Sequence, residues 1–286
     1  MSPKRSHIDE RHLLDEQTEM LLKQLEVPSS GSNDAAWEAI SKAIASKPSS
    51  KVRRMFPTAW VAAASIVILL SVGFGVLTRS TRIISAKGEH VAVVLPDGSN
   101  VILNSESELS YKKYLWWHKR EVKLKGEGFF KVKKGERFEV RTGNYVTSVL
   151  GTTFNVFARN DQIRVSCFTG KVGVREEQSG TNAILTPGLG VSSSGSSLGT
   201  VEQVSEKQKG WMSGEFYFTD EPLSNVFAEI ERQFNVKISC KGCENRRYSG
   251  YFNDKDLGQA LELVCVPMQL EYKITSENEV QVNPIN

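Results

Sequence analysis

The sequence predicts a multidomain chain: a short α-helical segment, one transmembrane helix, an antiparallel all-β domain and a C-terminal α/β domain that contains a βαβ repeat. Three observations support this fold class. An uncharged apolar run divides the chain, alternating apolar residues follow it, and one motif recurs near the C-terminus. The predicted boundaries are residues 1–55 for the helical segment, 56–78 for the transmembrane helix, 84–191 for the β domain, 192–210 for a linker and 211–286 for the C-terminal domain.

The apolar run extends from Thr58 to Leu77 and reads TAWVAAASIVILLSVGFGVL. A helix needs about 20 mostly apolar residues to cross the hydrocarbon core, and a single crossing must be helical because lipid offers no hydrogen-bond partners. More than fifty residues precede the run, which is not the layout of a signal peptide. Basic residues favour a cytoplasmic N-terminus and a periplasmic C-terminus in the inner (plasma) membrane, since Lys42, Lys47, Lys51, Arg53 and Arg54 precede the run and Arg79, Arg82 and Lys87 follow it.

Two amphipathic helices are expected before the run. The first covers about Asp9 to Glu26, and the second begins at the capping pair Asn33-Asp34. Two short helices cannot bury both of their apolar stripes alone, so the stripes either pair weakly, lie on the membrane surface or bind a partner. The residues of these stripes are Leu14, Leu21, Leu22 and Leu25 on the first helix and Trp37, Ile40 and Ile44 on the second.

Short alternating segments follow the apolar run. Val91, Val93 and Leu95 lead into the turn Pro96–Ser99, and similar segments continue to about Val191, which favours an antiparallel sandwich or barrel. The stretch SSSGSSLGT, residues 192–200, has the composition of a flexible linker. Beyond it, the motif Phe218–Leu223 matches Phe252–Leu257, and each copy reads as strand, helix, strand. We expect the two copies to share one sheet.

The residues point away from catalysis. The net charge of +3 provides no strong field for nucleic acid, and Cys240 and Cys243 lack the second ligand pair of a zinc site. We therefore expect no metal and no cofactor, while the cysteine pair is structural or incidental, including a local disulfide. One hypothesis remains open at Gly151-Thr152, where the Thr hydroxyl could attack the preceding carbonyl in a single self-cleavage; the alternative is that Gly151 serves a turn or bulge.

Several motifs together carry a resemblance. LPDGSNVILNSESELSY, REVKLKGEGFFKV, VLGTTFNVFA, GKVGV and LTPG resemble the periplasmic domain of FecR-type transmembrane anti-sigma factors. GEFYFTDEPLSNVFAEIERQFNVKI and the repeat after it resemble the C-terminal STN-like domain of Bacteroidetes members.

This resemblance implies a function and its partners. The N-terminal segment would bind an ECF-type sigma factor through the two leucine- and tryptophan-containing stripes. A TonB-dependent outer-membrane transporter would present its signalling domain to residues between Trp211 and Asn286. An intramembrane protease would then release the sigma factor, and no direct contact with nucleic acid is expected.

Two other functions compete with this one. A membrane-anchored DNA-binding regulator would need a helix-turn-helix and a basic face before the apolar run, and that segment is short and nearly neutral in charge. An envelope protein that binds glycan, or a transport or secretion partner, could use the aromatic cluster Tyr111, Tyr114, Trp116 and Trp117 as a platform. The other interpretation of this cluster is packing at a hairpin edge.

Overall fold

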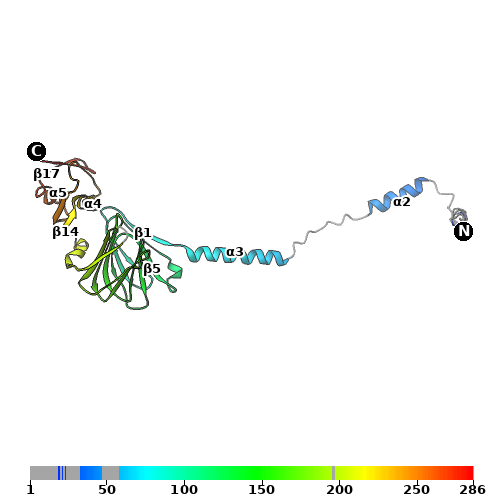
Figure 1. Ribbon diagram of the computed structural model, residues 1–286. Coiled ribbons are helices and arrows are strands. Elements are labelled where there is room, and N and C mark those ends of the chain that lie inside the picture. Colours follow the sequence, from blue (N-terminus) through cyan, green and yellow to red (C-terminus); the bar gives the residue numbers. More distant parts are fainter. Residues whose placement is uncertain are drawn as a thin grey trace, which may run out of the picture. The chain divides into compact units, whose positions relative to one another are not determined.

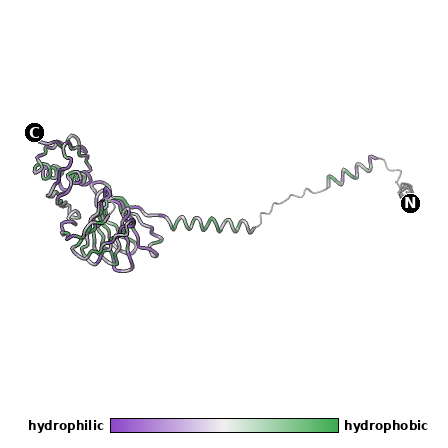
Figure 2. The backbone as a smooth tube through the Cα atoms, in the orientation of Figure 1, coloured by the Kyte–Doolittle hydropathy of each residue, from purple (hydrophilic) through white to green (hydrophobic). Residues whose placement is uncertain are grey.

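The computed structural model describes Glu19, Leu21, Lys23 and residues 33–46, 58–194 and 197–285. Helices α2 (Asn33–Ala45) and α3 (Thr58–Thr78) precede the β-strands. Residues Trp60–Thr78 of α3 are long and apolar enough to cross a membrane, and none of them is buried by the protein. In Figure 2, α3 is the long apolar helix. The apolar run therefore forms the helix that its composition predicts.

The β domain comprises thirteen strands among the described residues, and Figure 1 shows them curled around one interior. Leu103, Phe130, Val140 and Phe154 are fully buried in its core, where the Phe130 and Phe154 rings stack 5.1 Å apart. The elements are β1 (Thr81–Ser85), β2 (Val91–Val94), β3 (Asn100–Leu103), β4 (Ser107–Tyr111), the 3-10 helix η1 (Lys113–Leu115), β5 (Arg120–Lys131), β6 (Phe138–Thr142), β7 (Tyr145–Val149), β8 (Thr153–Arg159), β9 (Gln162–Thr169), β10 (Val172–Glu176), β11 (Asn182–Leu185), β12 (Leu189–Ser194) and β13 (Leu198–Gln203).

The predicted hairpin is confirmed, because β2 pairs antiparallel with β3 across the turn that contains Gly98. One strand pair differs from the antiparallel prediction: β5 and β6 run parallel, with Arg120 opposite Phe138. The reason lies in β5, whose first half pairs with β4 and whose second half pairs with β3 and β8. Gly126 lies between the halves at φ 96°, where a side chain would collide with Ser107. The strand turns back there, so a short loop can return the chain beside its own start.

The flexible-linker prediction for residues 192–210 is wrong. Residues up to Ser194 continue β12, which pairs with β9, and β13 then pairs with β12. A 3-10 helix, η2 (Glu206–Ser213), follows and buries Trp211. Serine- and glycine-rich composition misleads here because backbone hydrogen bonds to β9 and β13 hold β12 in the sheet, and Leu198 packs against the core. The strands of the β domain thus span 81–203, beyond both predicted ends.

The C-terminal domain contains β14 (Glu215–Pro222), α4 (Leu223–Phe234), β15 (Lys237–Cys240), β16 (Arg247–Asn253), α5 (Leu257–Cys265), β17 (Leu270–Ser276) and β18 (Glu279–Pro284). Both copies of the motif form strand, helix, strand, as predicted. They do not share one sheet: β14 pairs with β16, while β15, β18 and β17 form a second sheet. Strand β18, which lies outside the repeat, inserts between β15 and β17 and separates them. A disulfide joins Cys240 to Cys243 just after β15.

Candidate functional site: the contact between the folded domains

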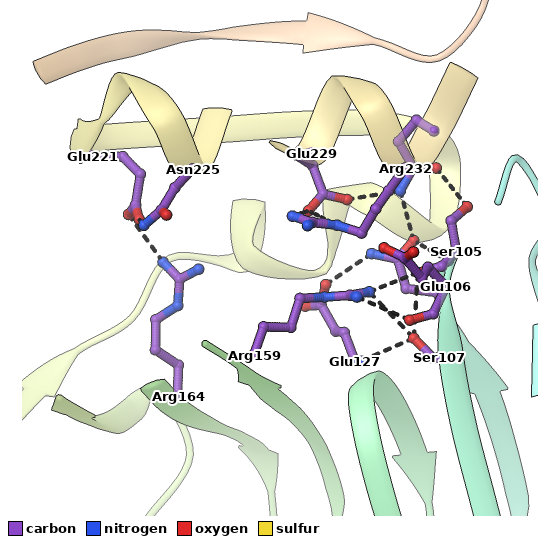
Figure 3. Close-up of polar contacts among 12 residues, drawn as sticks. Ser105, Glu106, Ser107, Glu127, Arg159, Arg164, Glu221, Asn225, Glu229 and Arg232 are labelled. Atoms are coloured by element: carbon purple, nitrogen blue, oxygen red, sulfur yellow. Dashed lines mark hydrogen bonds and ion pairs between the residues drawn. The ribbon is translucent and has the colours of Figure 1, made fainter. Parts of the chain in front are cut away.

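Helix α4 carries a buried polar side-chain network to the β domain (Figure 3). The Gln233 amide donates to the Oδ1 atom of Asn104 over 2.9 Å and to the Oε1 atom of Glu229 over 2.7 Å, while its own oxygen accepts from the Ser105 hydroxyl at 2.9 Å. The backbone carbonyl of Arg232 accepts from the N–H of Gly88 at 2.8 Å. Three of these hydrogen bonds join the end of α4 to the β domain, and the fourth, to Glu229, lies within α4.

Two buried glutamates face each other across this contact. Glu229 lies on α4 and holds the Arg232 guanidinium through its Oε2 atom, at 2.6 Å from Nη2. Glu127 lies on β5 and accepts from the amides of Asn104 and Asn155, at 2.8 and 2.7 Å. Both carboxylates are more than nine-tenths buried. The network thus contains charge that water does not solvate, and its stability depends on the partners.

The pKa values of the two glutamates are shifted in opposite directions. Burial raises the pKa of Glu127, and the nearby Glu229 carboxylate raises it further. Burial also acts to raise the pKa of Glu229, but the positive charges of Arg232 and Arg159 and its hydrogen bonds hold that pKa below the ordinary value. Glu229 is therefore the ionised member of the pair, and its charge is balanced by arginines from both domains.

Arg159 joins the network from β8. Its guanidinium donates to the backbone carbonyls of Ser105 and Glu106, at 2.6 and 2.9 Å, so it fixes the loop that Gln233 contacts (Figure 3). Burial lowers the pKa of Arg159, and the Glu229 carboxylate opposes that shift. One arginine thus couples the shape of a β-domain loop to a charge on the C-terminal domain.

Apolar packing and a cleft flank the network. Ile102 and Phe129 of the β domain pack against the core of the C-terminal domain, and the His90 ring contacts the Trp211 ring edge-on at 5.3 Å between centroids. Beside them the two domains enclose a cleft of about 940 Å³. The ion pair of Arg164 with Glu221 (3.3 Å) links the two domains at its margin. The two folded domains are therefore joined by packing, hydrogen bonds and charge together.

Two family models match the chain. The model described as "FecR protein" matches residues 81–173, and the model described as "FecR, C-terminal" matches residues 215–282. The chain belongs to the FecR family. The first match begins at the start of β1, and the second covers the β14–β18 region. No curated protein matches this FecR-family protein.

Two solved structures are similar to this FecR-family protein. Both are crystal structures of a "putative anti-sigma factor" from Parabacteroides distasonis. One has a TM-score of 0.67 and 27% identity, and the alignment covers 73% of this chain and 100% of that one. The other has a TM-score of 0.66 and 27% identity, with 72% and 100% covered.

The predicted sigma-binding residues fall partly within the described residues of this FecR-family protein. Trp37, Ile40 and Ile44 lie on α2, which buries none of its residues, and Trp37 is 72% exposed. Leu21 is also exposed. The predicted residues Leu14, Leu22 and Leu25 lie outside the described residues. The α2 stripe therefore has the exposure that a partner-binding face requires, and its role remains a prediction.

The Gly151-Thr152 pair lies in a tight corner between β7 and β8. A side chain at Gly151 would meet the Cα atom of Lys134 at 2.6 Å, so close backbone approach explains the glycine. The Thr152 hydroxyl is buried and donates to the carbonyl of Lys171 at 3.0 Å. This arrangement favours a structural role for both residues, and self-cleavage remains a hypothesis.

The aromatic cluster does not form one platform. Tyr111 and Trp116 are buried in the β-domain core, where the Trp116 ring packs edge-on against Tyr111 and Phe138. Tyr114 and Trp117 are exposed. Packing at a hairpin edge, the second interpretation of the cluster, therefore accounts for half of it.

Sequence reasoning missed most of the interdomain network. Glu229, Gln233 and Arg159 were not singled out. One signal was available: Glu229 and Gln233 are four residues apart on the same face as the buried Leu223, Val226 and Ile230. Polar residues at that spacing within an apolar stripe indicate a buried contact with another element.

Proposed function

We propose that this FecR-family protein is a transmembrane anti-sigma factor. Its N-terminal helices would bind an ECF-type sigma factor in the cytoplasm, and its two folded domains would receive a signal in the periplasm. The observation that carries this proposal is the division of the chain by α3: an exposed apolar stripe on α2 precedes it, and two domains joined by buried contacts follow it. The similarity to the P. distasonis protein supports the same function.

Two features support a chain orientation with the N-terminus in the cytoplasm and the C-terminus in the periplasm. Basic residues are more frequent before α3 than after it, which favours a cytoplasmic N-terminus. The Cys240–Cys243 disulfide lies in the C-terminal domain, and disulfides persist in oxidising compartments such as the periplasm. Protease added to spheroplasts tests this directly, because residues beyond Arg79 should be digested while the N-terminal segment is protected. Protection of the C-terminal domain would reverse the orientation.

Sigma binding is tested by co-expression with an ECF-type sigma factor of the same organism. The full chain should hold the sigma factor at the membrane and repress its promoters. If residues 1–55 neither bind that sigma factor nor change its transcription, the proposal fails. Repression that survives loss of the α2 stripe would place binding on other residues.

Signal reception is proposed for the C-terminal domain, within Trp211 to Asn286. Strands β14, β15, β16 and β17 each have one side without a strand partner among the described residues, and such edges accept an added strand. The partner would be the periplasmic signalling domain of a TonB-dependent outer-membrane transporter, and an intramembrane protease would complete the release. A chain that ends at Gly210 should lose binding of that signalling domain. Equal binding by the shortened chain would place the receptor site elsewhere.

A further inference from the structure

The end of the β domain next to α3 has an unusual surface. Residues 79 and 80 alone separate α3 from β1, and β1 pairs with β4 so that Thr81 lies opposite Tyr111. The Ser80 hydroxyl also donates to the Tyr111 carbonyl at 3.4 Å. In Figure 1 the chain passes from α3 to β1 with no other element between them. The loop that begins at Lys112 therefore starts beside the point where the chain leaves α3.

Two further segments lie at the same end. Arg120, which follows the first loop, donates to the carbonyls of Lys133 and Glu136 at 3.1 and 2.6 Å. The N–H of Gly135 donates to the carbonyl of Leu150 at 2.8 Å. We call residues 112–119, 133–137 and 150–151 together the exit surface. The C-terminal domain contacts Asn104 and Ser105, which precede β4, so it lies at the opposite end of that strand from the exit surface.

The exit surface combines exposed aromatic, apolar and cationic side chains. Trp117 is 83% exposed, Leu150 is 63% exposed, and Tyr114 is also exposed. No acidic residue occurs between Glu108 and Glu121, and Glu136 is the one acidic residue within the exit surface. Among the described residues, Lys112 and Lys134 form no ion pair, and neither does Lys113. Exposed apolar side chains gathered at one end of a domain mark a contact site for a protein or a membrane.

The short chain between α3 and β1 limits how far this end of the β domain can lie from the membrane. Three Cα–Cα steps from Thr78 to Thr81 span at most about 11 Å. The polar headgroup layer on each side of the hydrocarbon core is about 5–8 Å thick. If α3 spans the bilayer, Thr81 and the start of the loop at Lys112 beside it therefore lie in or against the headgroups. Trp and Tyr favour that layer, and lysines there attract anionic lipids.

We infer that the exit surface docks the β domain onto the anionic phospholipid headgroups of the membrane that α3 spans. This inference depends on one part of the proposed function, namely that α3 spans a membrane. Docking fixes the β domain against the bilayer, so that the C-terminal domain is held away from the membrane, where a soluble signalling domain reaches it.

A spin label at Leu150 tests this docking in the full chain. Cys167 and Cys265 are buried and Cys240 is bonded to Cys243, so Leu150→Cys adds one accessible thiol. The chain is placed in nanodiscs of phosphatidylcholine with about one third phosphatidylglycerol, and label accessibility to oxygen and to a water-soluble nickel chelate is measured. Val266→Cys on the C-terminal domain, another exposed apolar position, provides the matched control.

We expect the label at position 150 to be several-fold more accessible to oxygen than to the nickel chelate, and the label at position 266 to show the reverse. Trp117→Ala, or Lys112→Glu with Lys113→Glu, should shift the position-150 label towards water. Equal water accessibility at both positions in nanodiscs would overturn the docking and leave the span intact. Failure to enter nanodiscs would refute the span itself and the proposed function.

Discussion

Replacing Glu229 by Gln should destabilise the folded domains severely. The substitution keeps the shape of the side chain but removes the negative charge that Arg232 contacts at 2.6 and 3.1 Å. Arg232 and Arg159 would then remain beside each other with no carboxylate from α4, and the Gln233 amide would lose its charged acceptor. Removing one partner of a buried ion pair costs about 3–5 kcal/mol. For folded regions of about 150–250 residues, that loss corresponds to a melting temperature about 6–20 °C lower.

Far-UV circular dichroism of the full chain in detergent measures this melting temperature. Glu108→Gln is the matched control, because Glu108 is ion-paired with Arg82 at the surface, where the pair contributes little. We expect this control to melt near the wild type. A Glu229→Gln protein that melts within about 2 °C of the wild type would refute the assignment of a charged, stabilising Glu229.

Three other predictions concern the two buried glutamates and the Gly151-Thr152 corner. Because the pKa of Glu229 is lowered in the folded protein, its contribution to stability should be lost as pH falls below the ordinary glutamate value of about 4.3. Because the pKa of Glu127 is raised, its contribution should be lost as pH rises above that value. Melting curves of Glu229→Gln and of Glu127→Gln against pH check both signs. Gly151→Ala should lower stability by about 1–3 kcal/mol through collision with Lys134, and Gly173→Ala, whose nearest contact is at 3.8 Å, should cost less in the same denaturant titration. Thr152→Ala should leave the single full-length band on a gel unchanged, and a wild-type fragment beginning at residue 152 that this variant lacks would instead establish self-cleavage.

Local patterns predicted the elements well. The uncharged run became α3, the turn after Leu95 joined two antiparallel strands, and both copies of the repeat formed strand, helix, strand. These features depend on residues close together in the chain. Length, alternation and turn chemistry are enough to specify them.

Long-range pairing was not predictable in the same way. The parallel pairing of β5 with β6 depends on the reversal at Gly126, and the insertion of β18 depends on residues outside the repeat. The hydrogen bond between Ser105 and Gln233 joins residues 128 positions apart. A single sequence read by itself offers no signal for such a pair, so the interdomain network became visible only in the folded chain.

The most direct test of the proposed anti-sigma function is sedimentation of the sigma factor with membranes that contain the full chain. Trp37→Ala with Ile40→Ala truncates the exposed stripe of α2, and Lys42→Ala on the opposite face is the matched control. Our account predicts that the wild type and the control retain the sigma factor, while the stripe variant binds it about 30-fold or more weakly, as expected for loss of at least 2 kcal/mol at an aromatic anchor. A sigma factor that stays soluble beside the wild-type chain, or sediments equally with the stripe variant, would contradict the account.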